Sequence, residues 1–120
     1  MASIRSRVLI ALQSYNDYPE SAKNNAKKVL RWREEHGDEV KGMTRIGWTR
    51  ANQLAKGENI TRETIARMAS FKRPEKNAAV APEYKNTPWK DKGYVAWLGW
   101  GGTSGVNWAI RKLESIDRKK

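Results

Sequence analysis

The stretch from Thr44 to Phe71 most constrains the fold, because its apolar residues recur at helical spacings on both sides of a glycine. In its first half they lie three or four residues apart: Trp48, Ala51, Leu54 and Ala55. Thr44 is suited to cap the start of this helix. Gly57 follows the last turn, where a left-handed residue commonly ends a helix.

A second helix is predicted to begin at Thr61, whose hydroxyl can accept from an unpaired backbone N–H. Ile60 before this cap and Ile65 inside the helix have the spacing of a hydrophobic staple. Pro74 is expected to end the helix, because a proline disfavours helical geometry at the residue before it. The outward faces of the two helices carry seven basic residues: Arg45, Arg50, Lys56, Arg62, Arg67, Lys72 and Arg73.

Helix, tight turn and basic helix together form the outline of a helix-turn-helix. The same outline occurs in helical hairpins whose role is only structural. The spacing fixes neither the crossing angle nor the side chains that would face a DNA groove. Residues 44–73 are therefore interpreted either as a DNA-reading unit or as a structural αα-hairpin.

Two more helices are predicted before this unit. Residues 3–14 have an apolar stripe at helical spacing. Pro19 suits the first turn of the next helix, which runs to about Glu35 and ends at Gly37. Its inward side is expected to hold Ala22, Ala26, Val29, Leu30 and Arg33, and its outer side Lys23, Lys27, Lys28 and Arg31. This outer side either contacts phosphates or is simply solvated. His36 is expected to be a capping or surface residue.

Residues 74–93 contain three of the four prolines in the chain and few helix or strand signals, which predicts a long irregular loop. In this loop the aromatic residues Tyr84 and Trp89 lie among basic ones: Lys76, Lys85, Lys90 and Lys92. That mixture suits contact with single-stranded nucleic acid. The alternative is a linker that Trp89 pins to the core.

The segment 93–102 is apolar on all sides, which predicts a short buried helix from Tyr94 to Gly99 or, because it is brief, a strand. Thr103 or Ser104 is expected to cap a final helix. The inward stripe of that helix is Val106, Ala109, Ile110, Leu113 and Ile116, with Trp108 off its centre. Gly99, Gly101 and Gly102 either cradle a phosphate or form a tight turn against which Trp side chains pack.

The formal net charge is +11, from 24 basic and 13 acidic residues. The excess is spread over the chain: residues 1–36 carry seven basic and four acidic side chains, 37–78 nine and five, and 79–120 eight and four. Such a balance favours binding to a polyanion, although it also promotes solubility.

Several classes of site lack the residues they need. The chain has no cysteine and one histidine, which excludes thiolate sites and the usual zinc sites. Its acids do not cluster as metal-dependent cleavage requires. No apolar run has the length of a membrane span. We therefore expect no catalytic site, no cofactor, no metal ion and no membrane insertion.

At 120 residues the chain is expected to form one all-α domain. The predicted architecture is a compact bundle of about five short helices. It has a helix-turn-helix-like pair at 44–73, an irregular loop at 74–93, and an N-terminal helix within residues 1–16 that can lie at the periphery.

Three blocks occur in order within residues 20–117: KGMTRIGWTRANQLAKGENIT, RETIARMASFKRPEKN and GYVAWLGWGGTSGVNWAIRKL. Together they resemble a small Trp/Gly-rich helical domain of tailed-bacteriophage proteins, often encoded near or fused to head-maturation or capsid proteins. The matched polar and special positions are Arg50, Arg67, Arg73, Glu75, Trp100, Gly101, Gly102 and Trp108. Pro74 stands where the family pattern has a histidine, so any chemistry of that histidine is lost here. The resemblance implies a phage origin and a compact helical domain, and it carries no defined activity.

These observations predict a bacteriophage-encoded basic protein that binds nucleic acid through phosphate contacts on a helical face. DNA is expected as the partner in preference to RNA. The expected location is the host cytoplasm or the virion interior. The candidate contacts are Arg45, Arg50, Arg62, Arg67, Lys72, Arg73, Lys76 and Lys90. The alternative is a head-associated module that docks on an acidic phage or host protein, and a nuclease ranks last. Strandedness, sequence specificity and oligomeric state stay open.

Overall fold

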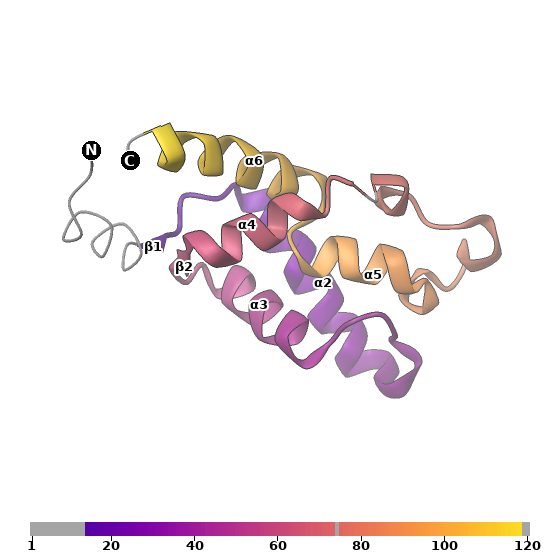
Figure 1. Cartoon of the computed structure of the whole chain (residues 1–120). Helices are drawn as coiled ribbons and strands as arrows, with labels where there is room; N and C mark the ends of the chain where they lie inside the picture. The colour runs from indigo at the N-terminus through magenta and orange to yellow at the C-terminus, as the bar shows by residue number, and fades with distance from the viewer. Residues whose placement is uncertain (1–13, 74, 119–120) are drawn as a thin grey trace.

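Helix α2 (Glu20–His36) runs through the centre of the fold, where it contacts α3, α5 and α6 (Figure 1). The structure is a computed structural model and describes residues 14–73 and 75–118. The helix predicted over residues 3–14 lies outside this part, except for its last residue. Ser14 instead pairs in strand β1 (Ser14–Tyr15), so a helix reaching residues 14–16 was wrong.

The inward face of α2 is made by Ala22, Ala26, Val29 and Trp32, all buried. Trp32 takes the place predicted for Arg33, which is exposed and lies with its guanidinium 4.5 Å from the centroid of the Trp48 ring. Burial of the indole removes more apolar surface from water, so the helix turns that side inward. Gly37 ends α2 as predicted, with φ of 55°.

Helix α3 (Arg45–Lys56) begins and ends as its capping residues predicted. Helix α4 (Arg62–Ser70) begins after Thr61 as predicted, but it ends at Ser70, earlier than the position of Pro74 indicated. The N–H of Gly47 donates to Thr44 Oγ1 at 3.0 Å, and the N–H of Thr64 donates to Thr61 Oγ1 at 3.4 Å. Gly57 ends α3 in the left-handed conformation. In Figure 1 the two helices extend from neighbouring ends beside strand β2 and separate toward their other ends.

Strand β2 (Ile60–Thr61) pairs antiparallel with β1, with Ser14 opposite Thr61 and Tyr15 opposite Ile60. Just after β1, the hydroxyl of Tyr18 donates to the carbonyl of Glu58 at 2.7 Å and lies 3.2 Å from that of Gln53. Burial, and to a smaller extent the Glu58 carboxylate, raises the pKa of Tyr18 to about 12. Tyr18 thus joins the start of the described chain to the α3–α4 turn.

The core consists of two clusters that meet along α2. The first joins α3, α4 and α6 and includes both staple residues, Ile60 and Ile65. The second joins the C-terminal half of α2 to α5 and includes Trp32, Val95 and Trp97. Because α2 contributes to both, it holds the α3–α4 pair against the rest of the bundle.

Helix α5 (Lys92–Gly99) confirms the helical alternative for the apolar segment and begins two residues earlier than predicted, capped by Asp91. Helix α6 (Gly102–Arg118) begins before Thr103 and Ser104, so neither is its cap. Thr103 Oγ1 accepts from Trp97 Nε1 at 3.3 Å instead. Trp108, predicted to lie off the centre of the inward stripe, is buried in the first core cluster.

The segment predicted as an irregular loop contains three 3₁₀ turns, η2 (Glu75–Ala78), η3 (Pro82–Tyr84) and η4 (Pro88–Lys90). The all-α prediction is confirmed, since the only strands in the described part are β1 and β2. Within residues 14–73 and 75–118, none of the helices combines the length and apolar character needed to cross a membrane.

Candidate nucleic-acid interface

A groove of about 580 Å³ lies between α3 and α4. Thr44 and α3 form one wall, the outward face of α4 forms the other, and Trp100 from the α5–α6 turn also lines it. Its lining residues are Thr44, Ile46, Arg50, Glu63, Thr64, Ala66, Arg67, Ser70 and Trp100. Two of the predicted contact residues, one from each helix, are thereby brought to the same place.

Arg50 and Arg67 are these two residues. Arg50 is half-buried on α3 and its Nη1 donates to Gln53 Oε1 at 3.0 Å, while Arg67 is exposed on α4. Within the described chain, neither guanidinium forms a salt bridge with a carboxylate. A guanidinium presents several N–H donors in a planar fork that matches phosphate or carboxylate oxygens. The groove therefore offers two cationic donor groups on facing walls.

The remaining lining of the groove combines apolar side chains with hydroxyl groups and one carboxylate. Trp100 is only 5% exposed and stacks on Phe71, with the ring centroids 5.5 Å apart. Ile46 lies at the rim and is 63% exposed. Among residues 14–73 and 75–118, it is the one large apolar side chain that is mainly exposed to solvent. A single exposed apolar side chain is common on protein surfaces, so Ile46 is of interest only because it lines the groove together with the two arginines. It lies off the apolar stripe of α3 and was not among the predicted contacts.

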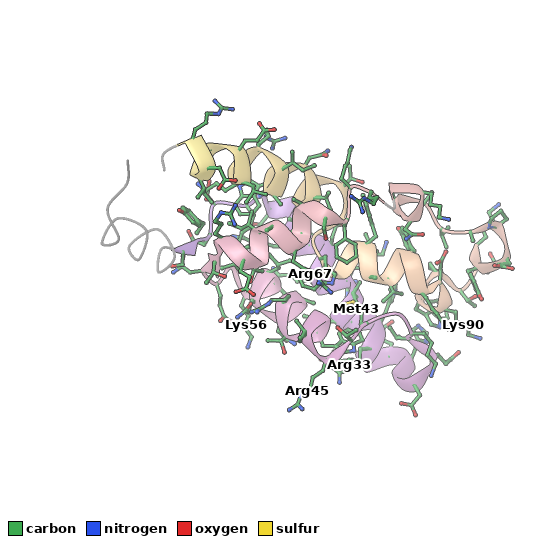
Figure 2. The ribbon with its side chains drawn as sticks, viewed as in Figure 1. Arg33, Met43, Arg45, Lys56, Arg67 and Lys90 are labelled. Carbon is green, nitrogen blue, oxygen red and sulfur yellow. The ribbon has the colours of Figure 1, made fainter. Side chains whose placement is uncertain are left out.

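Glu63 adds one carboxylate to the lining, on the same face of α4 as Arg67. Helix α3 contains no acidic residue and has Arg45 at its start and Lys56 at its end. Figure 2 shows these two toward opposite ends of α3, with Arg45 extending away from the ribbon. The α3–α4 face, defined here as Arg50, Glu63 and Arg67, is therefore net positive, and Arg45 and Lys56 add positive charge at the two ends of α3.

Other predicted contacts lie elsewhere or have partners. Arg62 forms a two-pronged salt bridge with Asp117 of α6, through Nε and Nη2 at 2.9 Å each. The hydrogen bond to Asp117 raises the pKa of Arg62 further. Lys90 lies 3.3 Å from Glu39, far from Arg67 in Figure 2. Three residues follow α4 outside the groove and are exposed: Lys72, Arg73 and Lys76.

The loop residue Trp89 does not offer a free stacking platform. Trp89 is half-buried, packs against the second core cluster and stacks on His36 with ring centroids 3.7 Å apart. This arrangement supports the interpretation of the loop as a linker pinned by Trp89. It also corrects the prediction for His36, which is a half-buried packing residue.

No family model, curated protein or solved structure matches this chain. The resemblance to a phage domain therefore stays a prediction. Three of the positions that carry it, Arg50, Arg67 and Trp100, nevertheless line the groove together. They come from three different segments, so only the tertiary structure relates them.

The glycines at the α5–α6 junction form a tight turn beside this groove. Gly101 and Gly102 have φ of 111° and 66°, and Asn25 Nδ2 donates to the Gly101 carbonyl at 2.9 Å. A Cβ on Gly102 would overlap the Asn25 amide. Because Asn25 fills the space against Gly102, a tight packed turn is favoured over a phosphate cradle. The side chains nearest to Gly99, Gly101 and Gly102 are those of Met43, Met68 and Asn25, and not the Trp side chains that were predicted. The described residues also contain no group of three or more His, Cys, Asp or Glu that could hold a metal ion.

Proposed function

We propose that this protein is a phage-encoded nucleic-acid-binding domain that holds phosphates on its α3–α4 face. The observation that carries the proposal is the pair Arg50 and Arg67, which face one groove and have no salt-bridge partner in the described chain. Arginine–phosphate hydrogen bonds are charge-assisted and often bidentate, which makes them about twice as strong as neutral ones. The distributed net charge of +11 adds long-range attraction for a polyanion.

The experiment is fluorescence anisotropy with labelled oligonucleotides, titrated from low to physiological salt. The test variant is the double substitution Arg50→Gln and Arg67→Gln. The control is Arg31→Gln with Arg111→Gln, two exposed arginines outside the groove that remove the same charge. Thermal melts of both variants verify that they fold.

We expect the test variant to weaken binding at least tenfold, and to lower the salt slope of log K by about two, one per lost phosphate contact. The control should have a much smaller effect. Equal losses of affinity in the test and the control variant would show that binding depends on the total charge and not on the groove. No binding even at low salt would contradict the proposal altogether.

A second candidate is a module that docks on an acidic phage or host protein. Exposed Ile46, which lines the same groove as the two arginines, favours it, because apolar contacts and arginines are both common in protein interfaces. Such a protein would co-sediment with phage heads emptied of DNA and would bind no oligonucleotide at physiological salt. Loss of co-sedimentation in Ile46→Ser, with an unchanged melting temperature, would identify the same face as the docking surface.

A further inference from the structure

We infer that the α3–α4 groove is a seat for one nucleotide of a single strand, with the flanking phosphates on Arg50 and Arg67. This inference rests on the proposed function and adds strandedness, the place of the base and a base preference. It moves the single-strand contact from the loop, where Trp89 is packed against His36, to a groove between two helices.

The shape of the surface favours a single strand over a duplex. A helix-turn-helix reads DNA by placing its second helix in the major groove, with its N-terminal residues on the base edges. Here the outward face of α4 forms one wall of a groove, so a ligand would enter the protein groove and α4 would not insert into a DNA groove. The N-terminal residue of α4, Arg62, is held by Asp117 of α6. The volume of about 580 Å³ is in the range of sites for small ligands and fits a nucleotide, not a duplex.

The groove also has the chemistry that a nucleotide needs. Arg50 and Arg67 provide donors for phosphate oxygens from opposite walls. Ala66, Ile46 and the small exposed part of Trp100 add apolar surface to the lining, on which the face of a base can pack. An extended strand places phosphates on both sides of each base, which matches arginines on both walls of a partly apolar groove.

Glu63 decides between ligand classes. A carboxylate repels a purely acidic peptide, but it accepts hydrogen bonds from the amino group of cytosine or adenine. Thymine and uracil have no such amino group. A nucleic acid therefore satisfies the arginines and Glu63 together, and the seat should prefer cytosine or adenine over thymine.

The probes are labelled 12-nucleotide strands of dC and of dT, and a 12-base-pair duplex, each measured by anisotropy at the same salt concentration. We expect dC to bind at least tenfold more tightly than the duplex and several-fold more tightly than dT. Ala66→Leu fills the groove and should bring single-strand affinity down to that of the duplex. Asn24→Leu adds a similar side chain on the exposed side of α2 and should change neither the single-strand affinity nor the duplex affinity.

Glu63→Gln should reduce the dC-to-dT ratio toward one, while total affinity rises through the lost negative charge. Ser70→Leu is a second groove-filling variant at an exposed position and replaces Ala66→Leu if that protein does not fold.

Equal affinity for strand and duplex, or a ratio that both groove-filling variants leave unchanged, would overturn the nucleotide seat while leaving phosphate binding intact. Polyglutamate of matched charge that displaces dC as well as unlabelled dC does would overturn it in favour of an acidic protein ligand. Absence of binding to every oligonucleotide at low salt would defeat the proposed function as well.

Discussion

The rings of His36 and Trp89 lie face to face, 3.7 Å between centroids and 3° between planes. His36 ends α2, and Trp89 lies in the last 3₁₀ turn before α5. The salt bridge from Lys90 to Glu39 lies next to this stack at 3.3 Å. The prolines and polar residues of this loop give no reason for order, so these contacts hold its end against the bundle.

We therefore expect His36→Ala to loosen the loop. Aromatic pairs contribute about 0.5–1.5 kcal/mol beyond their burial, so the free energy of unfolding should fall by roughly that amount. Limited proteolysis should show faster cleavage within residues 79–91, because local opening exposes the backbone. His36→Phe keeps an aromatic face for Trp89 and should remain protected. Equal cleavage of the wild type and both variants would mean that the stack does not hold the loop.

Tyr18 should make the protein sensitive to alkaline pH. Its pKa is raised to about 12 in the folded state, against about 10 in the unfolded chain. The stabilisation from neutral Tyr18 is therefore complete below pH 10 and is lost as the pH rises from about 10 to 12.

Tyr18→Phe removes both the titration and the hydrogen bond to Glu58. At pH 8 it should be less stable by about 1 kcal/mol, the usual net value of one hydrogen bond. Denaturant unfolding of both proteins at pH 8 and pH 11 measures the difference, which should shrink at pH 11. A constant difference would show that the pKa of Tyr18 is the same in the folded and the unfolded state.

Asp91 holds two segments with its two carboxylate oxygens. Oδ1 accepts from the N–H of Tyr94 at 3.2 Å as the cap of α5, and Oδ2 accepts from the N–H of Ala81 at 2.8 Å. Asp91→Ala loses both bonds and should cost about 1–2 kcal/mol. Asp91→Asn keeps one acceptor oxygen and should cost about half as much in thermal or urea unfolding. The same loss in both variants would argue against separate roles for the two oxygens.

Gly102 is required by both its backbone conformation and its packing. Gly102→Ala meets the cost of a positive φ, about 1–2 kcal/mol, and also forces Asn25 away from Gly101. Gly57→Ala is the matched control, since its φ is also positive but its Cβ would meet only the end of the Lys23 side chain at 3.4 Å. Urea unfolding should show a clearly larger loss for Gly102→Ala. Similar losses would mean that Asn25 moves aside without cost.

Arg62 and Arg67 lie on the same helix and should differ in binding. Arg62→Gln removes a partly exposed salt bridge to Asp117 and should cost up to about 1 kcal/mol in stability, with little change in oligonucleotide affinity. Arg67→Gln should weaken oligonucleotide binding and should leave the stability nearly unchanged. Anisotropy and thermal melts of the two single variants, which have equal charge, test this. Loss of affinity in Arg62→Gln as large as in Arg67→Gln would place α6 within the interface.

The sequence by itself determined the helical class, both ends of α3 and the start of α4. Thr44 and Thr61 cap the neighbouring turn, and Gly57 supplies a left-handed residue, so each signal acts within about four residues along the chain. The all-α class follows from the same local periodicity. These properties depend on backbone hydrogen bonds and on side-chain spacing along one segment, which a sequence displays directly.

Only the tertiary structure decided which faces meet. Periodicity could not show that Trp32 packs inward while Arg33 lies over Trp48, because both residues belong to the same turn of α2. Nor could it show that Arg62 forms a salt bridge with Asp117, while Arg67 lines the groove with Trp100 and has no salt bridge in the described chain. These outcomes depend on how α2 and α6 pack against the α3–α4 pair, which is a choice among competing long-range burials. The groove lies between α3 and α4, which diverge from the turn that joins them. The helices on which they pack, α2 for α3 and α6 for α4, set the distance between them.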